Sequence, residues 1–391
     1  MSAPASYDAI ILGAGGAGLM CAAVASQRGR KVLVLDHAPE PGRKILISGG
    51  GRCNFTNVGA APDRYLSANP HFARSALARY TPRDFLDLVE KHRIAWHEKT
   101  LGQLFCDGSA RQIVAMLLDE CAGATIRCDT PIRVVEHDGS RFRVTAGETK
   151  AEAPALVIAT GGPSIPKLGA TGFAYELAKR FGLKLVEPRP ALVPLTLGGD
   201  EALFRSLSGV ATPVEARAGG AAFREAALFT HKGMSGPAIL QVSSYWRHGE
   251  AVAIDFLPDT RPGWLRDAKR QRPRARLPAV LAETLPARLA DALAERIALP
   301  AELGNSPDKA LDAAERRLAD WTFQPSGTEG FAKAEVTVGG ISTAELSQQT
   351  MEARKVPGLY AIGEAVDVTG WLGGYNFQWA WASGVAAGQA L

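Results

Sequence analysis

The chain has 391 residues, 46% of them hydrophobic, which is enough for two or three cores and too long for one small domain. Its net charge of +4 does not by itself indicate nucleic-acid binding, and no run of about 18 apolar residues predicts a membrane span. Residues 1–4 show no secretory signal and the five cysteines include no C-x-x-C pair, so we expect a cytoplasmic multi-domain protein with free thiols, no membrane association and no metal site.

Residues 7–37 carry the pattern of a dinucleotide-binding unit. An apolar strand over residues 7–12 is followed by a glycine-rich turn and by a helical pattern over residues 19–28. The turn consists of Gly13, Ala14, Gly15, Gly16, Ala17 and Gly18. Glycines at these positions permit the tight turn, the approach of a pyrophosphate and the packing of the helix on the strand. A second strand ends in Leu35, Asp36 and His37, where a carboxylate is placed to accept ribose hydroxyls.

A second glycine-rich loop, with basic flanks, follows within residues 41–57. It contains Arg43, Lys44, Ser48, Gly49, Gly50, Gly51, Arg52, Cys53 and Asn54. Its backbone N–H groups can bind an anion, and its cations can neutralise a pyrophosphate or a reduced flavin. A turn that binds nothing would explain the first motif alone, but the coincidence of strand, turn, helix and acid favours a bound dinucleotide. An NAD domain does not need the second loop, so the sequence favours FAD.

Three later segments fit the same ligand. A buried strand pattern breaks at Ala159, Thr160, Gly161 and Gly162, which leaves bare backbone where a ring can approach. Another strand pattern, over residues 359–362, ends in Gly363 and Glu364. A helix of small residues over 379–388 follows Gly373, Gly374, Tyr375, Asn376 and Phe377. The positive end of this helix would stabilise a reduced flavin, whereas packing alone is the competing interpretation.

These motifs, in this order, resemble the BaiN/RdsA-type flavoproteins, FAD-dependent oxidoreductases related to the glutathione-reductase-like flavin fold. The resemblance covers nearly the whole chain and also rests on Phe229 to Pro237, which reads FTHKGMSGP. It implies that an acid after a glycine holds the ribityl chain of FAD. Family members usually have Asp there, so Glu364 departs from the pattern and Asp367 is an alternative. Ile132 completes the expected cofactor contacts.

The expected fold class is α/β, with a discontinuous Rossmann-like FAD-binding domain. Its two parts are residues 1–187 and 335–391. Alternating apolar patterns predict an inserted antiparallel β domain over 188–260 and 321–334, beginning near a group of prolines. Residues 261–320 are rich in Ala, Leu, Glu and Arg at helical spacing and predict a small helical subdomain.

Two side chains are candidates for proton transfer. His231 lies in a turn-rich motif, and an imidazole titrates near neutral pH; a turn-capping role is the competing interpretation. Cys53 could donate a proton if Arg52 lowers its pKa, although a cysteine in such a place is more often a small packed residue. No second G-x-G-x-x-G unit occurs, so NAD(P)H would have to visit the open face of the flavin, and another electron donor stays possible.

The substrate is the least defined property. The family includes an enzyme that makes dihydrouridine in ribosomal RNA and others that act on steroid enoyl groups, which implies hydride transfer to an activated C=C bond. A basic run at Arg261, Arg266, Lys269, Arg270, Arg272, Arg274 and Arg276 includes Trp264 and favours RNA, although a solvated loop is the simpler explanation. A small enone, or a flavin-binding redox sensor that acts on an RNA or protein partner without turnover, are the alternatives. The sequence does not define the oligomeric state.

Overall fold

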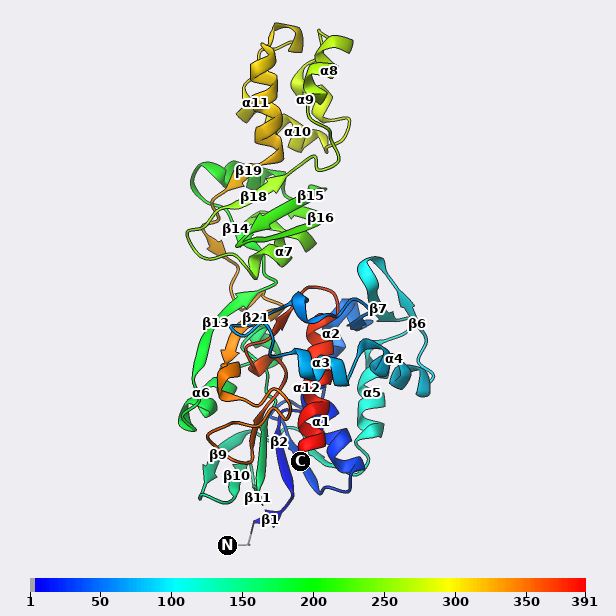
Figure 1. Cartoon of the computed structure of the whole chain (residues 1–391), viewed down its shortest axis with the longest axis vertical. Helices are drawn as coiled ribbons and strands as arrows, with labels where there is room; N and C mark the ends of the chain where they lie inside the picture. Colours follow the sequence, from blue (N-terminus) through cyan, green and yellow to red (C-terminus); the bar gives the residue numbers. More distant parts are fainter. Residues whose placement is uncertain (1–3) are drawn as a thin grey trace. The chain divides into compact units, whose positions relative to one another are not determined.

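The computed structural model describes residues 4–391 and divides into two compact units (Figure 1). The first unit contains Met1–Arg189 and Val336–Leu391, so its chain is discontinuous. The second unit contains Pro190–Glu335. No helix within residues 4–391 is long and apolar enough to cross a membrane.

A five-stranded parallel sheet forms the centre of the first unit. Its strands, in spatial order, are β22 (Leu359–Ala361), β12 (Ala155–Ile158), β2 (Ala9–Leu12), β3 (Val32–Leu35) and β8 (Thr125–Arg127). Every residue of the four strands β22, β2, β3 and β12 except Ala155 is buried, as continuous apolar strands of a covered parallel sheet should be. Because all pairings are parallel, the carboxyl ends of these strands meet at one edge.

Two helices from opposite ends of the chain pack on each other beside this sheet, α1 (Gly16–Gln27) and α12 (Tyr375–Ala390) (Figure 1). Glycines allow the close contact, since a Cβ at Gly384 would lie 2.7 Å from the carbonyl oxygen of Ala17. A Cβ at Gly388 would lie 2.8 Å from the carbonyl oxygen of Cys21. The small residues of α12 are therefore required by packing against α1.

Smaller sheets and helices complete the first unit. An antiparallel sheet beside a parallel edge strand has the order β1 (Ala5–Ser6), β11 (Thr149–Ala153), β10 (Phe142–Ala146) and β9 (Ile132–His137). Another contains β4 (Asn54–Asn57), β7 (Gln103–Cys106) and β6 (Trp96–Glu98), and two pairs join β5 (Tyr65–Leu66) to β23 (Thr369–Gly370) and β13 (Leu185–Ala191) to β21 (Val336–Ile341). The other helices are α2 (Arg43–Ile47), α3 (Arg74–Arg79), α4 (Pro82–Lys91), α5 (Ala110–Glu120) and α6 (Phe173–Arg180).

The second unit is built on an antiparallel sheet of seven strands. In spatial order they are β19 (Trp321–Phe323), β18 (Val252–Asp255), β15 (Ala211–Ala218), β16 (Ala221–Phe229), β17 (Gly233–Ser235), β14 (Leu195–Thr196) and β20 (Gly327–Thr328). The helix α7 (Pro237–Ser243) packs on β15 and β16. Between β18 and β19 the chain forms α8 (Trp264–Gln271), α9 (Leu277–Leu281), α10 (Ala287–Ile297) and α11 (Asp308–Ala319). The expected α/β class, with a parallel Rossmann-like sheet and separate antiparallel sheets, is confirmed.

Candidate active site

The first glycine turn lies at the carboxyl edge of the parallel sheet, against Asp36. Both oxygens of the Asp36 carboxylate accept backbone hydrogen bonds, from Ala14 N at 2.6 Å and from Ala38 N at 2.8 Å. Glycine is required at two places in the turn. A Cβ at Gly13, whose φ is 110°, would lie 2.5 Å from the Ala159 carbonyl oxygen, and a Cβ at Gly18 would collide with the Gly13 carbonyl oxygen.

Gly15 has a different environment, because a Cβ built there meets no atom within 4 Å. This glycine ends the turn at the start of α1, and within the described residues no side chain caps that helix. The first N–H groups of a helix carry partial positive charge and need acceptors. Open space over Gly15 beside these donors is what a pyrophosphate requires.

The second glycine loop starts against the first turn, since Gly42 N donates to the Ala14 carbonyl oxygen at 2.9 Å. Gly49, Gly50 and Gly51 have φ values of 56°, 67° and 83°, which L side chains rarely adopt. Three successive left-handed residues turn the chain from α2 into β4. The loop that the sequence singled out for a second anion site therefore adjoins the pyrophosphate turn.

Lys44 and Glu364 form an ion pair that joins this loop to the end of β22. The Lys44 Nζ lies 2.5 Å from one Glu364 oxygen and 2.8 Å from Ser164 Oγ. The other Glu364 oxygen accepts from Ser164 Oγ at 2.7 Å and from Thr337 N at 3.0 Å. The carboxylate of Glu364 thus meets three polar partners and, with them, connects four segments that are distant in sequence.

Lys44→Met is expected to lower the free energy of unfolding by about 1–2 kcal/mol, since it leaves a largely covered carboxylate without its cation. The Glu364→Gln change in the same background should recover most of this loss, because it removes the charge and keeps the size of the side chain. Urea unfolding of the two single variants and the double variant measures the coupling. If the loss of unfolding free energy in the double variant equals the sum of the losses in the two single variants, Lys44 and Glu364 are not coupled.

Asp367, the alternative acid, has different partners. It is 3% exposed, its carboxylate accepts from Ala68 N at 2.8 Å, and burial raises its pKa. These contacts tie β23 to the segment after β5 and involve no residue of either glycine loop. Glu364 is therefore the acid that lies beside the second loop.

The turn after β12 leaves a polar atom without a partner. Ala159 N donates to the Leu12 carbonyl oxygen at 2.9 Å, which fixes the turn beside the first glycine turn. The Thr160 Oγ1 is buried and has no hydrogen-bond partner among the described residues. A Cβ at Gly161 meets no atom within 4 Å, whereas one at Gly162 would lie 2.6 Å from Thr337 Oγ1. An unpaired buried hydroxyl next to open backbone is a further fit to a bound ligand.

The start of α12 is a packed turn in which each predicted residue has a definite contact. A Cβ at Gly373 would lie 2.9 Å from the Gln103 side chain, and one at Gly374 would collide with the Thr56 carbonyl oxygen. Tyr375 is buried and its hydroxyl accepts from Arg64 Nη1 at 2.8 Å. The Asn376 amide exchanges two hydrogen bonds of 2.9 Å with Gly370, and Phe377 stacks on Trp381 with ring centroids 5.6 Å apart. Asn376 therefore holds the preceding turn in place.

Other predicted contacts lie around the same edge. Arg43 Nη1 donates to the Leu168 carbonyl oxygen at 2.9 Å, and His37 Nε2 lies 2.9 Å from the Gly169 carbonyl oxygen. Thr130 N donates to the Asp36 carbonyl oxygen at 2.8 Å, which brings the segment before β9, two residues from Ile132, to Asp36. Ser48 Oγ donates to the Ile45 carbonyl oxygen at 2.7 Å.

Cys53 is fully buried, with a φ of 53°, and burial raises the pKa of its thiol well above the usual range. Arg52, by contrast, is exposed. A thiol with a raised pKa stays neutral and is a poor source of thiolate. The proton-donor role of Cys53 stays a prediction, and its environment favours a packing role.

Several polar residues of this site escaped the sequence analysis. Asn57 is 1% exposed, and its amide donates to the carbonyl oxygens of Leu101 and Gly373 at 3.0 and 2.8 Å. Gln378 Oε1 accepts from Thr56 Oγ1 at 2.6 Å. Ser164 and Thr337 complete the contacts of Glu364. Asn57 is the last residue of the second glycine loop, and this position was the only feature of the sequence that could have pointed to its role.

His231 lies in the second unit, at the tip of the turn between β16 and β17. Thr230 and Gly233 exchange backbone hydrogen bonds of 2.8 and 3.2 Å, which leaves His231 and Lys232 as the two central residues. The Thr230 hydroxyl accepts from Gly233 N at 3.1 Å and braces the turn. His231 is exposed, so its imidazole is presented on a short, well-supported turn.

Comparison with known proteins identifies the family. Residues 7–390 match the HI0933-like protein Rossmann domain. The chain belongs to the HI0933-like family of FAD-binding Rossmann proteins. It is 53% identical over 400 residues to a ribosomal RNA dihydrouridine synthase of Escherichia coli, with 98% of each chain covered. It is 46% identical over 394 residues to a ribosomal RNA dihydrouridine synthase of Haemophilus influenzae, again with 98% of each covered.

A third relative has a different substrate in its name. It is a 3-dehydro-bile acid delta(4,6)-reductase of Clostridium scindens, 30% identical over 406 residues, with 97% of this chain and 98% of the relative covered. Two of these relatives are named dihydrouridine synthases and the third a reductase. The expected resemblance, the flavin cofactor and the oxidoreductase class of this HI0933-like protein are confirmed.

Proposed function

We propose that this HI0933-like protein is an FAD-dependent reductase that forms dihydrouridine from uridine in ribosomal RNA. The observation that carries the proposal is 53% identity, over 98% of both chains, to a ribosomal RNA dihydrouridine synthase. The identity to the bile-acid reductase is far lower, at 30%, although its coverage is equally complete. Full-length similarity at these levels favours the RNA substrate over a small enone.

The chain's own residues would hold FAD as follows. The helix start at Gly15 would face the pyrophosphate and Asp36 the adenosine ribose. Glu364, Lys44 and the open backbone at Gly161 would surround the ribityl chain and the ring. When bound, FAD supplies the hydride for reduction of the C5=C6 bond of uracil.

Reduction of uracil also needs one proton and an electron donor. His231 would supply the proton to the pyrimidine ring, because it is the exposed imidazole of the family motif FTHKGMSGP. NAD(P)H is the proposed electron donor, visiting the site transiently, since the sequence contains only one G-x-G-x-x-G unit. On this proposal the single G-x-G-x-x-G motif serves the resident cofactor.

The basic run in the second unit is largely compensated by carboxylates, one from α8 itself, two from α11 and one that follows α9. The pairs are Arg261 and Arg270 with Asp267, Arg266 with Asp312, Lys269 with Asp308 and Arg272 with Glu283. Arg274 and Arg276 are exposed and have no carboxylate partner within residues 4–391. An RNA contact by phosphate attraction should therefore depend chiefly on these last two arginines.

The proposal predicts that deletion of the gene removes dihydrouridine from ribosomal RNA of the source bacterium. Reverse-transcription mapping or nucleoside mass spectrometry of RNA from the two strains measures the change, and purified protein with FAD and NAD(P)H should restore the modification in the RNA of the deletion strain. An unchanged map together with turnover of a steroid enone would favour the bile-acid-like activity. A flavin-loaded protein that turns over neither substrate would favour the redox-sensor alternative.

A further inference from the structure

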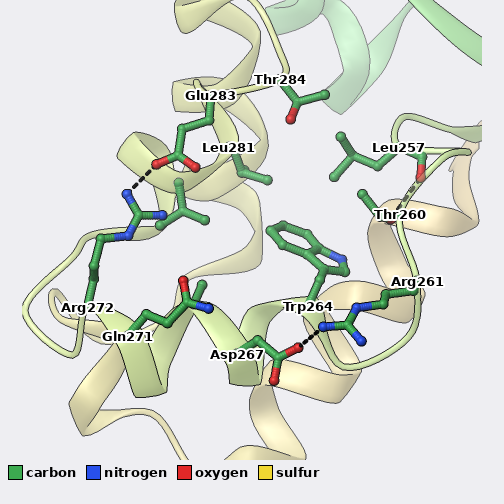
Figure 2. A pocket seen from close by; sticks show the side chains of 12 residues that line it. Leu257, Thr260, Arg261, Trp264, Asp267, Gln271, Arg272, Leu281, Glu283 and Thr284 are labelled. Atoms are coloured by element: carbon green, nitrogen blue, oxygen red, sulfur yellow. Dashed lines mark hydrogen bonds and ion pairs between the residues drawn. The ribbon is translucent and has the colours of Figure 1, made fainter.

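The helical part of the second unit contains a cavity of about 250 Å³ that no residue of the cofactor site lines. It lies between the loop before α8, the helix α8 itself and the segment from α9 to Thr284. Drug-sized ligands occupy pockets of about 300–1,000 Å³, so this cavity suits one small planar ring better than a flavin. Figure 2 shows the Trp264 side chain in the middle of the pocket, with Leu257 and Leu281 beside it.

Trp264 presents an aromatic surface that the fold leaves open. Its side chain is only partly buried, and its indole N–H donates no hydrogen bond within the described part of the chain. In Trp379 and Trp381 the indole N–H instead donates to a backbone carbonyl, at 3.0 and 2.8 Å. A half-exposed indole above apolar side chains is a surface on which a flat ring can stack.

The frame that carries Trp264 is firmly held. The Glu315 carboxylate, from α11, accepts from Gly263 N at 2.8 Å and from Leu265 N at 2.6 Å, on both sides of Trp264 in sequence. Arg266 Nε lies 3.0 Å from an Asp312 oxygen and links α8 to the same helix. The indole is therefore positioned before any ligand arrives, which lowers the ordering cost of binding.

Guanidinium groups stand on both sides of the pocket. Arg261 pairs with Asp267 and Arg272 pairs with Glu283, and the two arginine side chains are 81% and 49% exposed (Figure 2). Exposed ion pairs of this kind contribute little to stability, so each guanidinium can turn to a phosphate at low cost. Arg274 and Arg276 follow directly along the chain.

We infer that this pocket, here named the Trp264 pocket, binds one unpaired base of the RNA substrate by stacking on Trp264, with the exposed arginines of this segment, chiefly Arg274 and Arg276, on the adjacent phosphates. The inference rests on the proposed function for the identity of the substrate. An aromatic platform bordered by cations is how proteins hold single-stranded nucleic acid, and stacking accepts any base. The bound base is distinct from the uracil that is reduced, so the pocket acts in substrate docking.

The test compares Trp264→Leu with Trp264→Phe in the flavin-loaded full chain. A fluorescein-labelled single-stranded oligoadenylate of about twelve nucleotides is the probe, and anisotropy gives its Kd. Loss of one stacked base should raise Kd by about 10-fold in Trp264→Leu, while Trp264→Phe stays within about 3-fold of the wild type. The salt dependence of Kd should be unchanged in Trp264→Leu but weaker in the Arg274→Gln/Arg276→Gln variant, because only the latter loses phosphate contacts. Equal Kd values for Trp264→Leu and the wild type would overturn the inference.

A second measurement needs no variant. Photo-crosslinking of the wild-type protein to an iodouridine-containing oligonucleotide, followed by peptide mass spectrometry, should label the peptide that contains Trp264. Labelling only elsewhere would overturn the inference even if Trp264→Leu fails to fold. The two proposals fail separately: a protein that forms no dihydrouridine in ribosomal RNA refutes the function while probe binding still tests the pocket. Normal dihydrouridine formation by Trp264→Leu at an unchanged KM refutes the pocket alone.

Discussion

Gly15→Asp is expected to lower the affinity for FAD by at least about 100-fold and to leave the fold intact. The backbone at Gly15 does not have a positive φ, and a Cβ there meets no atom within 4 Å, so the new side chain fits the apoprotein. It would place a carboxylate where the pyrophosphate needs bare backbone and helix N–H groups. Like charges brought together at a binding site cost several kcal/mol, and about 2.7 kcal/mol already corresponds to 100-fold.

Gly172→Asp is the matched control for this prediction. Gly172 also lacks a positive φ, and a Cβ there also meets no atom within 4 Å, but it lies outside both glycine loops. Visible absorbance after desalting, with titration of the apoproteins by FAD, gives the occupancy and the Kd. Thermal unfolding without FAD should be alike for the wild type and both variants. Retention of FAD by Gly15→Asp would show that the pyrophosphate does not lie at the first turn, and the assignment of the site would fail.

The glycine turn could be predicted from the sequence because its physical requirement is local. A Cβ at Gly18 would meet the backbone of Gly13, five residues earlier, and a Cβ at Gly13 would meet the backbone of Ala159 on the neighbouring strand. Only glycine avoids both collisions. The buried strands β2, β12 and β22 could be located for a similar reason, since continuous apolar runs with a glycine close behind mark their carboxyl ends.

Long-range polar contacts could not be predicted in this way. The three partners that meet at Glu364 come from residues 44, 164 and 337, and nothing in their local sequence links them. The charge of the basic run shows the same limit. A count along the chain finds one acid among these cations, and so makes the run look more strongly positive than it is in the fold. Folding brings Glu283, Asp308 and Asp312 to the same cations. The distribution of charges along a sequence does not show which carboxylates the fold brings to these cations from distant positions.

His231→Gln is expected to slow dihydrouridine formation by about 100-fold while flavin content and flavin reduction by NAD(P)H stay unchanged. A positioned general acid contributes roughly 10²–10⁴ in rate, and glutamine keeps the polarity but cannot deliver a proton. Single-turnover rates of dihydrouridine formation and of flavin reduction measure the two effects separately.

Lys232→Gln separates proton transfer from a general effect on the turn or on RNA binding. Lys232 is the other central residue of the same turn, and its ammonium lies 3.0 Å from a Glu329 oxygen. Lys232 has no role in the proposed proton transfer, so replacing it should change the rate of dihydrouridine formation by less than about 3-fold. Since His231 is exposed, added imidazole should also restore part of the activity of a His231→Ala variant. Equal losses in both glutamine variants, with no restoration by imidazole, would assign the turn to RNA contact and leave the proton donor to another group.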